Sequence, residues 1–121
     1  MDLLLQRGED ALEAEEYGVA LEHFTALTDH APDFAEGWNA RATVLFRKDL
    51  YGPALADIRR ALALNPQHFD AMTGLAVILQ TTGLHAEALE VWYLLRAVHP
   101  HRPELEQAIG MLEVEIGGEA L

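Results

Sequence analysis

The chain contains no cysteine and no serine, and these two absences exclude much of the usual chemistry of proteins. Without cysteine it has no disulfide, no thiol nucleophile and no zinc–thiolate site. Without either residue it lacks the most frequent nucleophiles of covalent catalysis. The nine glycines are scattered and form neither a G-x-G-x-x-G pattern nor a Walker phosphate loop. We therefore expect a protein with no catalytic site and no cofactor.

Long apolar runs are also absent, because no stretch approaches the roughly 20 residues that a membrane-spanning helix requires. The amino-terminal segment 1–5 is too short and carries the wrong charge for a signal peptide. We expect a cytoplasmic location for the chain as it stands. A periplasmic location stays open if the sequence is a piece of an exported precursor.

Positive charge is scarce, and the formal net charge is −12. Residues 1–34 hold nine acids and one arginine, residues 35–68 hold three acids and five bases, and residues 103–121 hold five acids and no base. Such a chain repels phosphate backbones and anionic membrane surfaces. We expect neither nucleic acid nor a membrane as a partner, and we favour a protein or peptide partner that is neutral or basic.

The feature that is present is a repeat. Pro32, Pro66 and Pro100 lie 34 residues apart, and the chain divides into units 1–34, 35–68 and 69–102. Within each unit, apolar residues recur at the spacing of two helix faces, and the proline ends the second helix. Small residues at positions 8 and 20 of each unit let the two helices approach closely. A fixed period of this length is typical of stacked helical repeats.

The middle unit carries the pattern most fully, in Trp38, Arg41, Ala42, Leu45, Ala54, Ile58, Ala61 and Pro66. This pattern resembles the tetratricopeptide repeat family over residues 1–102. The resemblance implies a single all-α domain over residues 1–121. It would be a right-handed α-solenoid of seven helices, made of three helix–turn–helix units and a capping helix at 103–116. We expect the capping helix to end at Gly117 and Gly118, with a charged outer face, and the turns within the units at 15–18, 49–52 and 83–85.

The resemblance also implies a function, a protein–protein interaction module or scaffold that binds a peptide or helix of a partner in a groove lined by the first helices. The expected groove residues are Glu9, Glu36, Asn39, Thr43, Phe46, Arg47, Asp70, Thr73, Val77 and Gln80. Family members that bind the acidic tails of chaperones use a Lys/Asn carboxylate clamp at such positions. No lysine occurs in this set, so we do not transfer that specificity.

An alternative is a role in assembly. Leu3, Leu4 and Leu5 begin the first helix of a unit that has no earlier unit to cover it. Three consecutive leucines cannot all face inward on one helix, so at least one is expected to be exposed. This end then offers a surface for self-association, or for stacking onto further repeats of a longer protein.

Two further expectations concern polar residues. Arg41 and Asp57 occupy positions that hold Leu75 and Val91 one unit later, so the polar pair and the apolar pair change together. We predict a partly buried ion pair between Arg41 and Asp57. His99 and His101 flank a proline in the last inter-unit loop, where two imidazoles would need a further ligand to bind a metal. We read them as loop residues and expect no metal site.

Overall fold

The computed structural model describes residues 2–120 and contains seven helices in that range. They are α1 (Asp2–Glu13), α2 (Tyr17–His30), α3 (Ala35–Arg47), α4 (Tyr51–Leu64), α5 (Phe69–Thr81), α6 (His85–Val98) and α7 (Pro103–Ala120). The all-α fold expected from the repeat is confirmed. The helices form two compact units, residues 1–68 with α1 to α4 and residues 69–121 with α5 to α7. None of the described helices is long and apolar enough to cross a bilayer.

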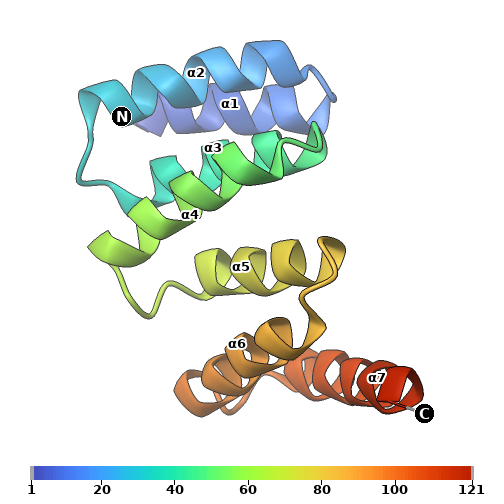
Figure 1. The fold of residues 1–121 in the computed structure, drawn as a ribbon. Coiled ribbons are helices and arrows are strands. Elements are labelled where there is room, and N and C mark those ends of the chain that lie inside the picture. Colours follow the sequence, from blue (N-terminus) through green and yellow to red (C-terminus); the bar gives the residue numbers. More distant parts are fainter. Residues whose placement is uncertain (1, 121) are drawn as a thin grey trace. The chain divides into compact units, whose positions relative to one another are not determined.

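Consecutive helices pack as hairpins within each unit (Figure 1). In the first unit α1 packs against α2, α3 packs against α4, and α2 also contacts α3. In the second unit α6 packs against both α5 and α7. Ala20, Ala54 and Ala88 lie 34 residues apart on the second helix of each hairpin, and all three are fully buried. Alanine leaves room for the facing helix, so the close approach predicted from small residues is confirmed.

Glycine replaces alanine where the first hairpin is tightest. Gly8 on α1 faces Phe24 on α2, whose ring is fully buried. A Cβ atom added at Gly8 would lie 2.2 Å from the Cε1 atom of that ring. No heavy atom fits at that distance, so the first hairpin requires glycine at this point as long as Phe24 keeps its place.

The turns within the hairpins share one backbone conformation. Glu15, Asp49 and Gly83, again 34 residues apart, have φ angles of 59°, 61° and 87°. This left-handed conformation ends the first helix of each pair and is unfavourable for residues with a side chain. The turns therefore fall at 14–16, 48–50 and 82–84, earlier than the sequence predicts, and Gly18 and Gly52 lie inside the first turns of α2 and α4.

The helix ends at the prolines follow the prediction, and the end of the last helix does not. Helices α2, α4 and α6 each stop shortly before a proline of the series. Helix α7 continues through Gly117 and Gly118 to Ala120, so the expected end at residue 116 is wrong. Neither glycine adopts a positive φ, which is the conformation that stops a helix. Inside a helix a glycine costs only about 1 kcal/mol relative to alanine.

The predicted ion pair between Arg41 and Asp57 is confirmed, and it is bidentate. Arg41 Nε donates to Asp57 Oδ2 at 2.8 Å, and Nη2 donates to Oδ1 at 2.9 Å. The Asp57 side chain is 8% exposed and the Arg41 side chain 20% exposed. Parallel hydrogen bonds of this kind fix the orientation of both groups. The pair therefore holds α3 against α4 at one defined register.

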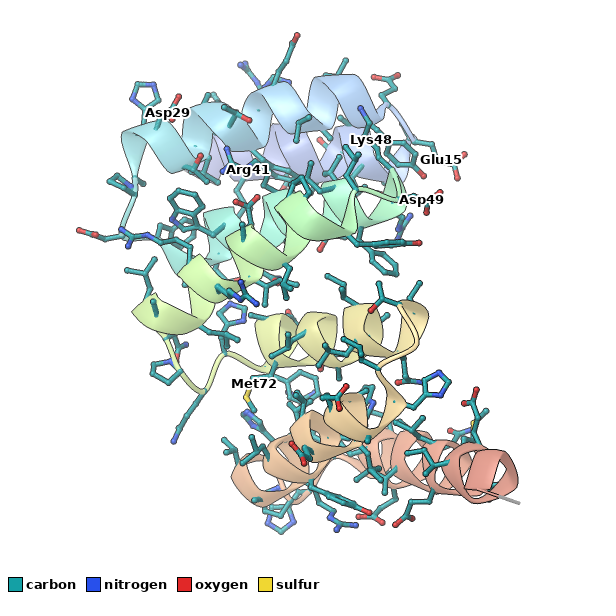
Figure 2. All side chains as sticks on the ribbon, viewed as in Figure 1. Glu15, Asp29, Arg41, Lys48, Asp49 and Met72 are labelled. Atoms are coloured by element: carbon teal, nitrogen blue, oxygen red, sulfur yellow. The ribbon has the colours of Figure 1, made fainter. Side chains whose placement is uncertain are left out.

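Arg41 also reaches the preceding hairpin. Its Nη1 atom donates to the hydroxyl of Thr28 at 3.2 Å, and the Thr25 hydroxyl lies 3.5 Å away, both on α2. The guanidinium carbon lies 5.1 Å from the centre of the Trp38 ring. The hydrogen bond to Asp57 raises the pKa of Arg41, and the negative charges of Asp57 and Asp29 act in the same direction against partial burial. Figure 2 labels Arg41, at the meeting of α2, α3 and α4.

We expect the Arg41–Asp57 pair to be replaceable only as a pair. Asp57→Val should lower the free energy of unfolding by about 2–4 kcal/mol, because it leaves a partly buried guanidinium without its partner. The double variant Arg41→Leu/Asp57→Val copies Leu75 and Val91 and should lie within about 1 kcal/mol of the parent. Urea unfolding of the three proteins measures this. A double variant as unstable as the sum of its single variants would contradict the prediction.

A second prediction concerns the tight contact in the first hairpin. Gly8→Ala should lower the free energy of unfolding by about 1–3 kcal/mol despite the better helix propensity of alanine, because the added methyl group overlaps the Phe24 ring. Adding Phe24→Ile reproduces the combination of Ala42 and Ile58 in the second hairpin. A double-mutant cycle, read by thermal unfolding, should then show favourable coupling. Strict additivity would mean that the two positions do not constrain each other.

Candidate functional site

The clearest hollow among the expected groove positions lies in the first compact unit. It has a volume of about 390 Å³ and is lined by Glu9, Leu12, Glu13, Glu15 and Arg47. These residues come from α1, from the turn after it and from the end of α3. Of the predicted groove residues, the structure brings Glu9 and Arg47 together here.

The hollow is acidic with an apolar floor. Three carboxylates and one guanidinium surround the half-buried side chain of Leu12, and the four charged side chains are exposed. Within the described residues Arg47 forms no ion pair. Such a site offers an aliphatic contact together with excess negative charge, which suits the long aliphatic stem and cationic head of a lysine or arginine.

Leu12, Glu13 and Glu15 line the hollow but are absent from the groove set listed above, and Glu15 lies in the turn after α1. Figure 2 labels it at the turn after α1. Its left-handed backbone closes that turn, and its side chain lines the hollow. The signal that points to it is the recurrence of this turn position at Asp49 and Gly83, although the period alone does not show which side chain borders a cavity.

The other predicted residues of the first unit lie along α3. Asn39, Thr43 and Phe46 are half-buried. The Thr43 hydroxyl donates to the carbonyl of Asn39 at 3.2 Å, so it keeps only its acceptor capacity for a ligand. The Phe46 ring packs against Tyr51 with the ring centres 5.5 Å apart. The Tyr51 hydroxyl donates to Asp49 at 3.0 Å, and this bond raises the pKa of Tyr51.

Glu36 has a structural partner. Its Oε1 atom lies 2.5 Å from Nε2 of His68, whose side chain is buried at the end of the first unit. The carboxylate itself is half exposed. The contact ties the loop after α4 to the start of α3, so Glu36 contributes to packing as well as to the acidic surface.

The predicted residues of the second unit lie on α5. Asp70 is exposed, and Thr73, Val77 and Gln80 are half-buried. The Gln80 amide oxygen accepts a hydrogen bond from the Trp92 indole at 2.8 Å and is therefore used inside its own hairpin. The Thr73 hydroxyl oxygen is buried and has no hydrogen-bond partner among the described residues. Of these four, Thr73 is the residue whose polar atom is buried without a partner there.

The loop with His99 and His101 does not assemble a metal site from the described residues, because no three His, Asp or Glu side chains converge anywhere among them. The His99 ring packs edge-on against Phe69, with the ring centres 5.0 Å apart. The Arg102 guanidinium carbon lies 4.2 Å from the centre of the same ring. The histidine loop is thus held against the start of α5 by aromatic contacts.

The leucines at the start of α1 divide into two groups. Leu4 and Leu5 are half-buried and pack against the core formed by Ala11, Ala20 and Phe24. Leu3 is 59% exposed. One of the three therefore points outward, as the helix period requires, and the apolar surface available for self-association is the side chain of Leu3.

The comparisons with known proteins agree with the fold. The family model described as "Tetratricopeptide repeat" matches residues 5–56 and 51–98. A TPR repeat-containing protein of Rhizobium etli is 30% identical over 118 residues, which are 98% of this chain and 58% of the relative. The chain thus spans less than two thirds of the length of this relative.

Two solved structures share the fold at low sequence identity. The first TPR of Spaghetti (RPAP3) bound to the HSP90 peptide SRMEEVD is 19% identical, with a TM-score of 0.88, over 95% of this chain and 91% of that one. The TPR2B domain:pHsp70 complex of yeast Sti1 is 20% identical, with a TM-score of 0.86, over 94% of this chain and 96% of that one.

The assembly alternative makes a prediction for Leu3. If this end self-associates, the mass by light scattering should rise above 13.4 kDa with concentration, and Leu3→Glu should return it to that value. Leu4→Glu is not a suitable test, because Leu4 packs on the core and its substitution should lower stability as well. A mass of 13.4 kDa at every concentration would remove this alternative.

Proposed function

The chain belongs to the tetratricopeptide repeat family, and we propose that it works as a protein-interaction module that binds an extended peptide of a partner protein on its first helices. The observation that carries this proposal is the hollow lined by Glu9, Leu12, Glu13, Glu15 and Arg47. It lies where the predicted groove positions of the first two repeats meet.

The charge of the hollow favours a basic residue in the partner. With three carboxylates against one arginine, a lysine or arginine side chain would gain attraction on entering it, whereas an acidic side chain would be repelled. Leu12 at the floor would contact the aliphatic part of such a side chain. Each exposed charge contributes modestly, so the hollow would set preference more than total affinity.

The fold neighbours support peptide binding as the general mode of recognition. We expect this chain to differ from them in the charge of the peptide that it prefers. The first TPR of Spaghetti is bound to SRMEEVD, a peptide rich in acids at its end. The only lysine of the present chain is Lys48, which lies outside the predicted groove set. Figure 2 labels it at the turn after α3. We infer a partner segment of the opposite charge.

The remaining surface of α3 would complete the binding face of the first unit. Asn39 offers an amide and Phe46 an aromatic edge, and both are half-buried on the helix that also carries Arg47. An amide beside an apolar surface suits a peptide backbone and one apolar side chain. The preformed helices require little ordering on binding, so most of the entropy cost falls on the partner.

The experiment compares short capped peptides that differ only in a central Lys, Gln or Glu, titrated into the ¹⁵N-labelled protein. The Lys peptide should bind most tightly. Glu9→Gln/Glu13→Gln should reduce its advantage over the Gln peptide roughly three- to tenfold, as expected for the loss of two exposed charges. SRMEEVD should bind more weakly than the Lys peptide.

The matched control is Glu22→Gln/Asp29→Asn, which removes two carboxylates from α2 and leaves the hollow intact. This variant should keep the preference for lysine. Equal losses in both double variants would show that the overall charge attracts the peptide, and the proposal for the hollow would then fail. A preference for the Glu peptide would overturn it directly.

A further inference from the structure

The outer side of α7 carries exposed glutamates, as the sequence predicts, and between them runs an apolar strip that the sequence did not reveal. Leu105, Ile109 and Leu112 are buried on one side of the helix. At helical spacing, the opposite side carries Met111, which is 68% exposed, and Val114, which is 77% exposed. The full set, called the α7 outer stripe below, is Gln107, Gly110, Met111, Val114 and Gly118.

The glycines of the stripe have no role in packing within the chain. A Cβ atom added at Gly110 or Gly118 would meet nothing within 4 Å. Each glycine inside a helix costs about 1 kcal/mol relative to alanine, and neither has a positive φ that would justify it. Their effect is to leave a flat strip of helix backbone beside Met111 and Val114, which a second helix can approach closely.

Carboxylates border the stripe on both sides. Glu104 lies 3.6 Å from an Arg102 nitrogen, and Glu106 lies 3.5 Å from an Arg96 nitrogen, so the first half of the border is balanced. In the second half, no arginine or lysine among the described residues balances the negative charge of the carboxylates.

Glu113 and Glu115 flank Val114, and within the described residues neither is paired with an arginine or lysine. Glu113 accepts a hydrogen bond from Tyr93 at 2.6 Å, and Glu115 lies 3.9 Å from His85. The carbonyl end of the helix adds further negative potential here.

We propose that the α7 outer stripe docks an amphipathic helix of a partner protein, one whose apolar stripe is bordered by lysine or arginine. Charge selects this occupant over a second copy of the chain. Two copies meeting through the stripe would bring the Glu113 and Glu115 borders together, with like charges opposed at a desolvated interface. A basic helix pairs with both borders and buries Met111 and Val114, as in helix-in-groove recognition.

This docking surface is separate from the hollow between α1 and α3, so the two proposals can fail independently. The probe is a fluorescein-labelled Leu/Lys amphipathic helix of 18 residues, the length of α7. The same peptide with Glu in place of Lys is the charge control. We expect the Lys peptide to bind at least about tenfold more tightly by anisotropy, and Met111→Gln/Val114→Gln to weaken it about fivefold or more.

The matched control variant is Val19→Gln, an exposed valine on α2 in the other unit, which should leave the affinity unchanged. Glycine amides report the location in ¹⁵N spectra. Signals of Gly110, Gly117 and Gly118 should shift on binding, whereas those of Gly18 and Gly52 should not. Because the substituted side chains are exposed, thermal unfolding of the variants should match the parent.

Three results would overturn the proposal. One is no binding of the Lys peptide, or binding that Met111→Gln/Val114→Gln leaves unchanged. Another is equal shifts at Gly18 and Gly110, which would mean general attraction to a chain of net charge −12. The third is a dimer of the free protein that dissociates in the same double variant, which would assign the stripe to a second copy.

Discussion

The closeness of paired helices is the constraint on which the rest of this structure depends. A hairpin of two helices buries little apolar surface unless the backbones approach, and approach requires small side chains at the crossing. Ala20, Ala54 and Ala88 meet that need identically in the three repeats, and Gly8 meets it more severely beside Phe24. Once these contacts are set, the outward residues of each helix follow by its period, and so does the α7 outer stripe.

Most of the fold was predictable because the same sequence pattern recurs in all three units of 34 residues. Three prolines give three helix ends, and the change from Arg41 and Asp57 to Leu75 and Val91 gives one side-chain pair without an alignment. Signals that occur only once were less reliable. Gly117 and Gly118 look like a stop signal, yet the backbone there stays helical. Glu104, Glu106, Glu113 and Glu115 are exposed on α7 as expected, but their positions do not reveal the apolar strip of Met111 and Val114 between them.

The sequence assigns the candidate residues to one helix face, but it does not reveal the cavity between them. Helical spacing assigned Glu9 and Arg47 to the same surface, and both side chains line the hollow described above. The contribution of Glu15 required knowledge of the turn. The hydrogen bonds between Gln80 and Trp92 and between Glu36 and His68 could not be predicted from the sequence, because a groove position does not reveal which neighbour its side chain contacts. Charge is the more general property: the hollow and the end of α7 both carry an excess of carboxylates.

The hydrogen-bonded cluster of Arg41, Asp57, Thr25 and Thr28 also makes the order of the repeats matter. Its groups come from two repeats, with Thr25 and Thr28 in the first and Arg41 and Asp57 in the second. The positions equivalent to the two threonines are Tyr93 and Arg96 in the third repeat, so a copy of the second repeat grafted after the third would place a guanidinium against another cation. The units look like interchangeable modules, but the chemistry at this junction gives the array a direction.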